Sequence, residues 1–163
     1  MRSSKPARIA DLVYFFDTSA LAKLYHPELG TDTVTAIVQS RHRTLIVSQL
    51  VTVEMASVAA IKVRRGEMLV AQADSMLRQI TVNVALGDLL VDRIDDQIYA
   101  SASHLLTRHA RLHSLRTLDA LHLASAIRRR NSTSLDFFIT ADRALAVVAQ
   151  LEGLAVMNPE HPS

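Results

Sequence analysis

The 163-residue sequence contains no cysteine, few aromatic residues and no long apolar run. Without cysteine the chain can form no disulfide, no thiolate metal site and no thiol nucleophile. Aromatic residues make up only 4%, so we expect no base-stacking platform of the kind that binds single-stranded nucleic acid. The longest apolar runs, such as LIVS and LAVVA, are far shorter than the roughly 20 residues that cross a bilayer. We therefore expect no membrane span and a cytoplasmic protein.

The composition is that of one folded domain. Hydrophobic residues make up 49% and charged residues 21%, with a net charge of +2, which is ordinary for a globular protein. Residues 1–12 are basic and polar and lack the apolar core of a secretory signal, so we interpret them as an N-terminal extension of a domain that spans 13–159. Basic clusters occur at 41–43, 62–65, 108–116 and 128–130. They suit a polyanionic partner such as nucleic acid, but cations also gather at the carboxyl ends of helices.

Short apolar runs alternate with segments of helical spacing along the chain. The runs predict strands at 13–16, 44–48, 81–84, 136–140 and 154–158. The spacing predicts helices at 31–40, 52–65, 67–79, 92–108, 117–130 and 141–151, with a surface loop over 128–134. Strands that are apolar without alternation and are separated by helices indicate a parallel sheet covered on both faces. The predicted fold is a single α/β domain, a three-layer α/β/α structure with a central parallel sheet.

Four acidic residues follow or adjoin the carboxyl ends of the predicted strands, where open α/β sheets place their functional residues. Asp17 follows the first strand, and Glu54 falls in the first turn of the helix after the second. Asp119 opens a helix that otherwise has the pattern of a buried one, and Asp142 follows the strand that ends at Thr140. Acids favour helix N-termini by up to about 1 kcal/mol, which would explain each of them separately. Because function in open α/β sheets lies at the carboxyl ends of the strands, we expect the four to converge at that edge.

Crowded carboxylates repel one another, so a cation is needed to hold them together. An all-oxygen set formed by Asp17, Glu54, Asp119 and Asp142, helped by hydroxyls such as that of Thr140 or Ser19, suits Mg²⁺ or Mn²⁺ and not zinc. Such an ion lowers the pKa of a bound water and stabilises charge on phosphate oxygens, which is the chemistry of phosphodiester hydrolysis.

Four segments together resemble one family: FFDTSALAKLY, SQLVTVEMASV, LRTLDALHLASA and FITADRAL with GLAVMNP. They are similar, in order and over about 13–159, to the PIN-domain ribonucleases, specifically the VapC-type toxins of toxin–antitoxin pairs. The resemblance implies a three-layer fold, a Mg²⁺- or Mn²⁺-dependent endoribonuclease acting on RNA, a cognate antitoxin protein as partner, and a homodimer. The family's acids fall on Asp17, Glu54, Asp119 and Asp142, and its strand-end hydroxyl on Thr140.

Other interpretations remain open from the residues. His122, one turn after Asp119, could reach the site or could be a hydrogen-bonded core residue. Arg116 could contact a phosphate or lie on the surface. His104, His109 and His113 have spacings that could hold zinc, although a solvated face is the commoner explanation. The apolar stripe of that helix is expected to be core, at Ala120, Leu123, Ala124 and Ile127.

Three other functions are known for domains that gather acids at a sheet edge or keep such a fold. A phosphoacceptor receiver domain wants a lysine after a late strand, and the only lysines are Lys5, Lys23 and Lys62. An acid-dehalogenase-type phosphatase wants two aspartates separated by one residue after the first strand, where this chain has DTS. A catalytically inactive module that only binds RNA or protein has no need of four repelling acids, and a metal-dependent cleavage assay separates it from an enzyme.

Overall fold

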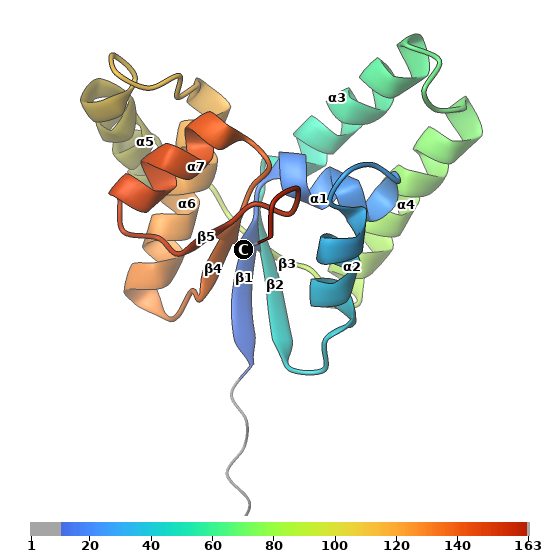
Figure 1. Cartoon of the computed structure of the whole chain (residues 1–163), viewed down its shortest axis with the longest axis horizontal. Helices are drawn as coiled ribbons and strands as arrows, with labels where there is room; N and C mark the ends of the chain where they lie inside the picture. The colour runs from blue at the N-terminus through green and yellow to red at the C-terminus, as the bar shows by residue number, and fades with distance from the viewer. Residues whose placement is uncertain (1–10, 163) are drawn as a thin grey trace, which may run out of the picture.

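A five-stranded, all-parallel sheet in the order β3-β2-β1-β4-β5 forms the centre of the protein in the computed structural model, which describes residues 11–162 (Figure 1). The strands are β1 (Leu12–Phe16), β2 (Arg43–Ser48), β3 (Leu90–Asp92), β4 (Phe137–Ile139) and β5 (Val156–Met157). Of the expected N-terminal extension, residues 1–10 lie outside the described residues, and Leu12 begins β1.

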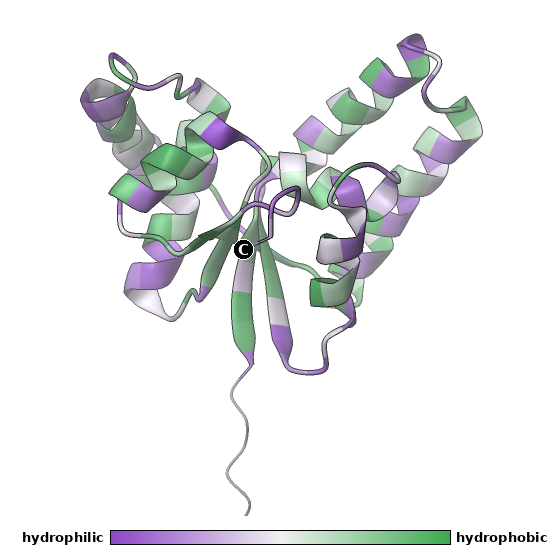
Figure 2. Cartoon of the chain, in the orientation of Figure 1, coloured by the Kyte–Doolittle hydropathy of each residue, from purple (hydrophilic) through white to green (hydrophobic). Residues whose placement is uncertain are grey.

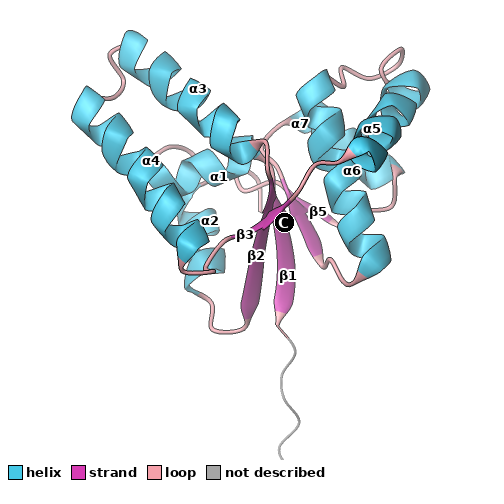
Figure 3. Cartoon of the chain, turned by 180° about the vertical axis from the view of Figure 1, so that it is seen from behind, coloured by secondary structure: helices cyan, strands magenta, loops and turns pink. Residues whose placement is uncertain are grey.

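Helices cover both faces of this sheet, which confirms the predicted three-layer fold (Figures 1 and 3). One layer contains α1 (Thr18–Tyr25), α2 (Thr31–Gln39), α3 (Val51–Arg64) and α4 (Val70–Ala85). The other contains α5 (Asp96–His109), α6 (Thr117–Ser132) and α7 (Arg143–Leu151). None of the described helices is both long and apolar enough to span a membrane.

The alternation of side chains along β1 divides the core into two halves. Tyr14 and Phe16 pack with the α1–α4 layer, and Val13 and Phe15 pack with the α5–α7 layer. Both faces of the strand are therefore apolar, as a covered parallel strand requires. Figure 2 shows hydrophobic residues along the strands and mixed hydropathy on the helices. The expected stripe of α6 is core, with Ala120, Leu123 and Ala124 buried and Ile127 packed against them.

One predicted strand is wrong, and one short helix was not predicted. The run TVNV at 81–84, expected to be a strand, lies inside α4, and the third strand is β3 at Leu90–Asp92. Ile80 is buried one turn after Met76, so the helical period that places these side chains against the core overrides the β propensity of the valines. The short helix α1 was not predicted, because the apolar pattern of TSALAKLY is brief and directly follows a strand.

The expected basic loop at 128–134 is mostly helix, since α6 continues to Ser132. Its three arginines fasten the end of this helix to its neighbours. Arg129 forms an ion pair with Asp92, and Arg128 contacts Asp95 at 2.6 Å. Arg130 donates to the backbone oxygen of Glu152 at 2.8 Å. This cluster is therefore engaged within the fold rather than presented to a polyanion.

Candidate active site

The sheet reverses its direction of growth at β1. From β1 the chain adds β2 and β3 on one side, then crosses over to add β4 and β5 on the other. Ligands of open α/β sheets bind in the crevice at such a switch point, at the carboxyl ends of the strands. A cleft of about 490 Å³ lies there and is lined by Asp17, Glu54, Asp119 and Asp142. The structure thus brings all four predicted acids to one cleft.

Asp17 is the most buried of the four and is tied to the neighbouring strand. It is 4% exposed and caps α1, where its Oδ1 accepts from the backbone N–H of Ala20 at 2.9 Å. Thr140, at the end of β4, donates to its Oδ2 at 2.7 Å, and Ser19 donates to both oxygens at 2.8 and 2.9 Å. Burial raises the pKa of Asp17, against the lowering effect of the hydrogen bonds from Thr140 and Ala20. The predicted hydroxyl of Thr140 therefore orients this acid.

Glu54 lies in the first turn of α3 and is held by residues from two other elements, α1 and α6. Thr18 of α1 donates to its Oε2 at 2.5 Å, and the Nε2 of His122 on α6 lies 2.5 Å from the same oxygen. His122 is 2% exposed, and its other ring nitrogen lies 3.0 Å from the Oγ of Ser48 at the end of β2. Burial opposes ionisation of Glu54, but the His122 and Thr18 hydrogen bonds outweigh it and hold its pKa below the usual value.

Asp119 and Asp142 share one arginine. Arg116 donates through Nε to Asp119 at 3.1 Å and through Nη2 to Asp142 at 2.9 Å. Asp119 also accepts from the backbone N–H of Arg116 at 3.2 Å, and Asp142 caps α7 by accepting from Leu145 at 3.0 Å. The hydrogen bonds to Asp119 and its charge raise the pKa of Arg116. Both acids therefore cap the start of a helix and also line the cleft.

The four carboxylates do not form a closed ion cage as they lie. Among the described residues, no three His, Asp or Glu side chains converge to hold a metal ion. The guanidinium of Arg116 lies between Asp119 and Asp142, which shows that the cleft accepts a cation at this point. The donors are all oxygens, and Mg²⁺ is usually held by one or two carboxylates together with several waters. The donor set therefore fits Mg²⁺ or Mn²⁺ without a preformed cage.

Several residues in or behind the cleft were missed or left open by the sequence analysis. The sequence left His122 open between the core and the site, and it is both buried and bonded to Glu54. Ser48 and Thr18, each beside the end of a strand, were given no role. Lys23 is 4% exposed and lines the other end of the cleft, where its Nζ lies 2.7 Å from Glu160. No local sequence pattern marks a lysine that the fold buries, whereas the position of Ser48 at the end of β2 was a usable signal.

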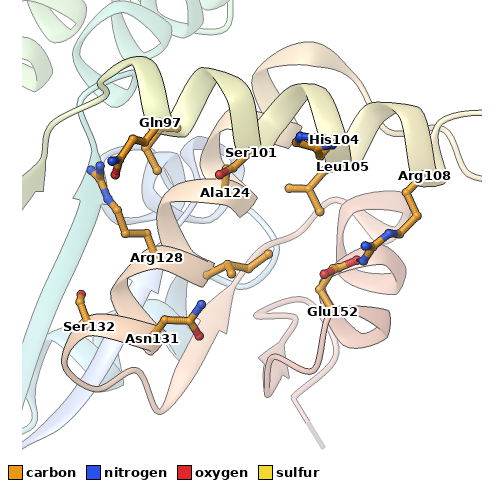
Figure 4. Close-up of a pocket in the computed structure, with 12 residues that line it drawn as sticks. Gln97, Ser101, His104, Leu105, Arg108, Ala124, Arg128, Asn131, Ser132 and Glu152 are labelled. Carbon is orange, nitrogen blue, oxygen red and sulfur yellow. The ribbon is translucent and has the colours of Figure 1, made fainter.

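A second cleft, of about 460 Å³, lies between α5, α6 and the end of α7 (Figure 4). Its charged groups are paired: Arg108 donates to Glu152 at 3.0 Å, and His109 lies 2.6 Å from the same carboxylate. His104 lines this cleft, whereas His109 is 9% exposed. The contact with Glu152 gives His109 a structural role other than the zinc ligand considered above. None of the four acids lines this second cleft.

Comparisons with known proteins agree with this architecture. The family model of the PIN domain matches residues 14–151. Solved structures that share the fold include the following three. FitAB bound to an IR36 DNA fragment is 16% identical, with a TM-score of 0.66 over 92% of this chain and 97% of that one. VapC20 of Mycobacterium tuberculosis, a sarcin–ricin loop cleaving toxin, is 18% identical, with a TM-score of 0.62 over 92% and 99%.

The third structure is VapBC2 of Rickettsia felis bound to a fragment of its promoter DNA. It is 14% identical, with a TM-score of 0.59 over 90% of this chain and 98% of that one. Identities this low establish the fold and not the activity. A comparison with curated proteins gives no match.

Proposed function

This chain belongs to the PIN-domain family, and from that premise we propose that it is a Mg²⁺- or Mn²⁺-dependent endoribonuclease, the toxin of a toxin–antitoxin pair. The observation that carries the proposal is the meeting of four carboxylates from four different elements in one cleft at the switch point of the sheet. Helix capping explains each acid locally, but it does not explain why all four face the same cleft.

We assign the metal to Asp17, Glu54, Asp119 and Asp142. When bound, a divalent ion would lower the pKa of a water and stabilise the charge that develops on the phosphate oxygens. The protein's own contribution is to position these ligands. Thr140 and Ser19 orient Asp17, and the hydroxyl of Thr140 also accepts from the backbone N–H of Asp142 at 3.1 Å, so the two acids share one anchor.

Arg116 is placed to bind a phosphate group of the RNA substrate. Its side chain is 74% exposed and lies beside two of the acids, so it can turn outward while staying at the mouth of the cleft. A guanidinium presents two parallel N–H donors to phosphate oxygens. With a metal ion replacing it between the acids, Arg116 would be free to bind the RNA backbone.

The direct test is cleavage of total RNA by the purified protein. We expect cutting with Mg²⁺ or Mn²⁺, none in excess EDTA, and none with Asp142→Asn in the presence of metal. Asp96→Asn is the matched control, because Asp96 is a first-turn acid of α5 outside the cleft. Robust cutting in excess chelator would refute metal dependence, since a metal-free ribonuclease needs an acid/base pair such as two histidines. Binding of RNA without any cutting would indicate the inactive module instead.

The proposed antitoxin would act at the same cleft. Solved neighbours of this fold include VapBC and FitAB assemblies. The position of Arg116 between Asp119 and Asp142 illustrates how an arginine or lysine of a partner could neutralise these acids and compete with the metal. We expect a tight complex with a small neighbouring gene product that stays inactive with added Mn²⁺. A gene neighbourhood without such a partner, together with harmless expression of this chain alone, would contradict the toxin assignment.

We also propose a homodimer, as the family resemblance implies. Light scattering at several protein concentrations, with and without the antitoxin, measures this directly. A chain that is monomeric at all concentrations would contradict it without affecting the assignment of the cleft.

A further inference from the structure

The hydrogen bonds of Glu54 all converge on one of its two oxygens. Thr18 Oγ1 and His122 Nε2 each lie 2.5 Å from Oε2. Among the described residues, no hydrogen bond to Oε1 is found, although Glu54 lines the cleft. The fold therefore commits one carboxylate oxygen to the protein and leaves the other as the oxygen that can face a ligand.

His122 is itself held in place through its second nitrogen. Its Nδ1 lies 3.0 Å from Ser48 Oγ, which also accepts from the backbone N–H of Leu50 at 3.3 Å. A carboxylate can only accept, so the hydrogen on Nε2 points to Glu54. The Ser48 hydroxyl lies at Nδ1, so both ring nitrogens of His122 are engaged along the chain of contacts from β2 through α6 to α3. The imidazole ring is thus oriented from behind, as partners of metal ligands commonly are.

The acids of the adjoining helices follow the same pattern. Asp142 commits Oδ1 to the backbone N–H of Leu145 at 3.0 Å, as the cap of α7. Asp119 commits Oδ2 to the backbone N–H of Arg116 at 3.2 Å. In each of these two acids, and in Glu54, backbone or buried groups fasten one oxygen. These three carboxylates are therefore arranged to offer a metal one oxygen rather than two, whereas Asp17 has both of its oxygens hydrogen-bonded.

Whether a carboxylate binds through one oxygen or two affects which metal ion a site prefers. Mg²⁺ requires six oxygens in near-octahedral geometry at short distances, whereas Ca²⁺ takes six to eight ligands and is often bound by both oxygens of one carboxylate. We infer that His122 is a specificity-determining positioning residue that keeps Glu54 bound through Oε1 alone, so that the cleft favours Mg²⁺ and Mn²⁺ over Ca²⁺. This inference rests on the proposed metal site, and His122 itself is not assigned as a ligand.

The test compares metal affinities rather than activity. Calorimetric titration with Mn²⁺, Mg²⁺ and Ca²⁺ is made on the wild type, His122→Leu and His122→Gln. We expect His122→Leu, which removes one of the two donors to Oε2, to reduce the preference for Mn²⁺ over Ca²⁺ by roughly tenfold, the scale on which losing a partner of a metal ligand changes metal affinity. His122→Gln should keep most of the preference, because its amide N–H can replace the Nε2–H. Thr18→Val removes the other Oε2 donor and should shift the preference in the same direction.

The matched control is His109→Leu. His109 is also largely buried and contacts a glutamate, Glu152, at 2.6 Å, but this pair lies outside the cleft. We expect its metal preference to equal that of the wild type. If the preference is unchanged in His122→Leu, or, should that variant not fold, in Thr18→Val, the inference is overturned and the proposed metal site stands. An equal shift in His109→Leu also overturns it. If the wild type binds none of the three ions, the proposed function fails and the inference with it.

Discussion

Asp119→Asn separates the capping role of this acid from its proposed role as a metal ligand. The asparagine oxygen can still accept from the backbone N–H of Arg116, which Asp119 does at 3.2 Å, so the start of α6 keeps its hydrogen bond. What is lost is the ion pair with the Arg116 side chain. That side chain is 74% exposed, so the pair is worth at most about 0.2–1 kcal/mol.

Repulsion between the acids opposes this loss. Carboxylates bridged by one guanidinium lie within about 8 Å of each other, where like charges in water repel by about 0.5 kcal/mol. The two effects nearly cancel, and the stability of the metal-free variant should stay within about 1 kcal/mol of the wild type. For a domain of this size that corresponds to a change in Tm of no more than roughly 2–4 °C.

Adding a metal ion should then distinguish Asp119→Asn from the wild type. At a concentration of 100 times Kd, a ligand stabilises the folded protein by about 2.7 kcal/mol, and a 100-fold weaker affinity leaves about 0.4 kcal/mol. The rise in Tm on adding Mn²⁺ should therefore be smaller in Asp119→Asn by roughly 5–9 °C, and RNA cleavage should collapse. Melting with and without Mn²⁺, beside the cleavage rate, measures both, with Asp96→Asn as the control. If Asp119→Asn has a lower Tm without metal, yet shows the same rise in Tm with Mn²⁺ as the wild type and cleaves RNA normally, Asp119 is only a helix cap.

Three further perturbations test the charges and the core. Burial raises the pKa of Asp17 above that of the unfolded chain. The wild type therefore loses stability as pH rises through the folded pKa, because Asp17 ionises less readily in the folded state than in the unfolded chain. Asp17→Asn does not ionise there, so in urea titrations without metal its stability should rise relative to that of the wild type over that pH interval. Burial opposes ionisation of Glu152, but the hydrogen bonds from His109 and Arg108 outweigh it and hold the pKa of Glu152 below its usual value. Its contribution should be complete at pH 7 and fade as pH falls below that value, so wild type and Glu152→Gln should converge in acid; a constant gap would contradict this. Leu123 is fully buried, and Leu123→Ala should cost about 2–5 kcal/mol in urea unfolding.

Periodicity identified most of the layers, and its failures have a common cause. The strands β1, β2 and β4 lie at the apolar runs that predicted them, because strands covered on both faces carry apolar residues without interruption. The run at 81–84 has the same β-branched character, yet the packing of Ile80 against the core keeps it in α4. The three-residue strand β3 is too short to have a pattern of its own, so only its pairing with β2 identifies it.

The sequence by itself placed four acids at strand ends and helix starts, because carboxylates there follow from local chemistry that any helix N-terminus shares. Only the tertiary structure decided what each of their oxygens does. Arg116 reaches from one helix start to another, and Ser48 orients His122 across 74 residues of sequence. Such contacts depend on which elements the switch point of the sheet brings together, and no spacing along the chain encodes them. The tertiary structure likewise raises the pKa of Asp17 through burial and lowers the pKa of Glu54 through the hydrogen bonds from His122 and Thr18. The two acids are alike in sequence, and they differ because of the donors that the fold places around them.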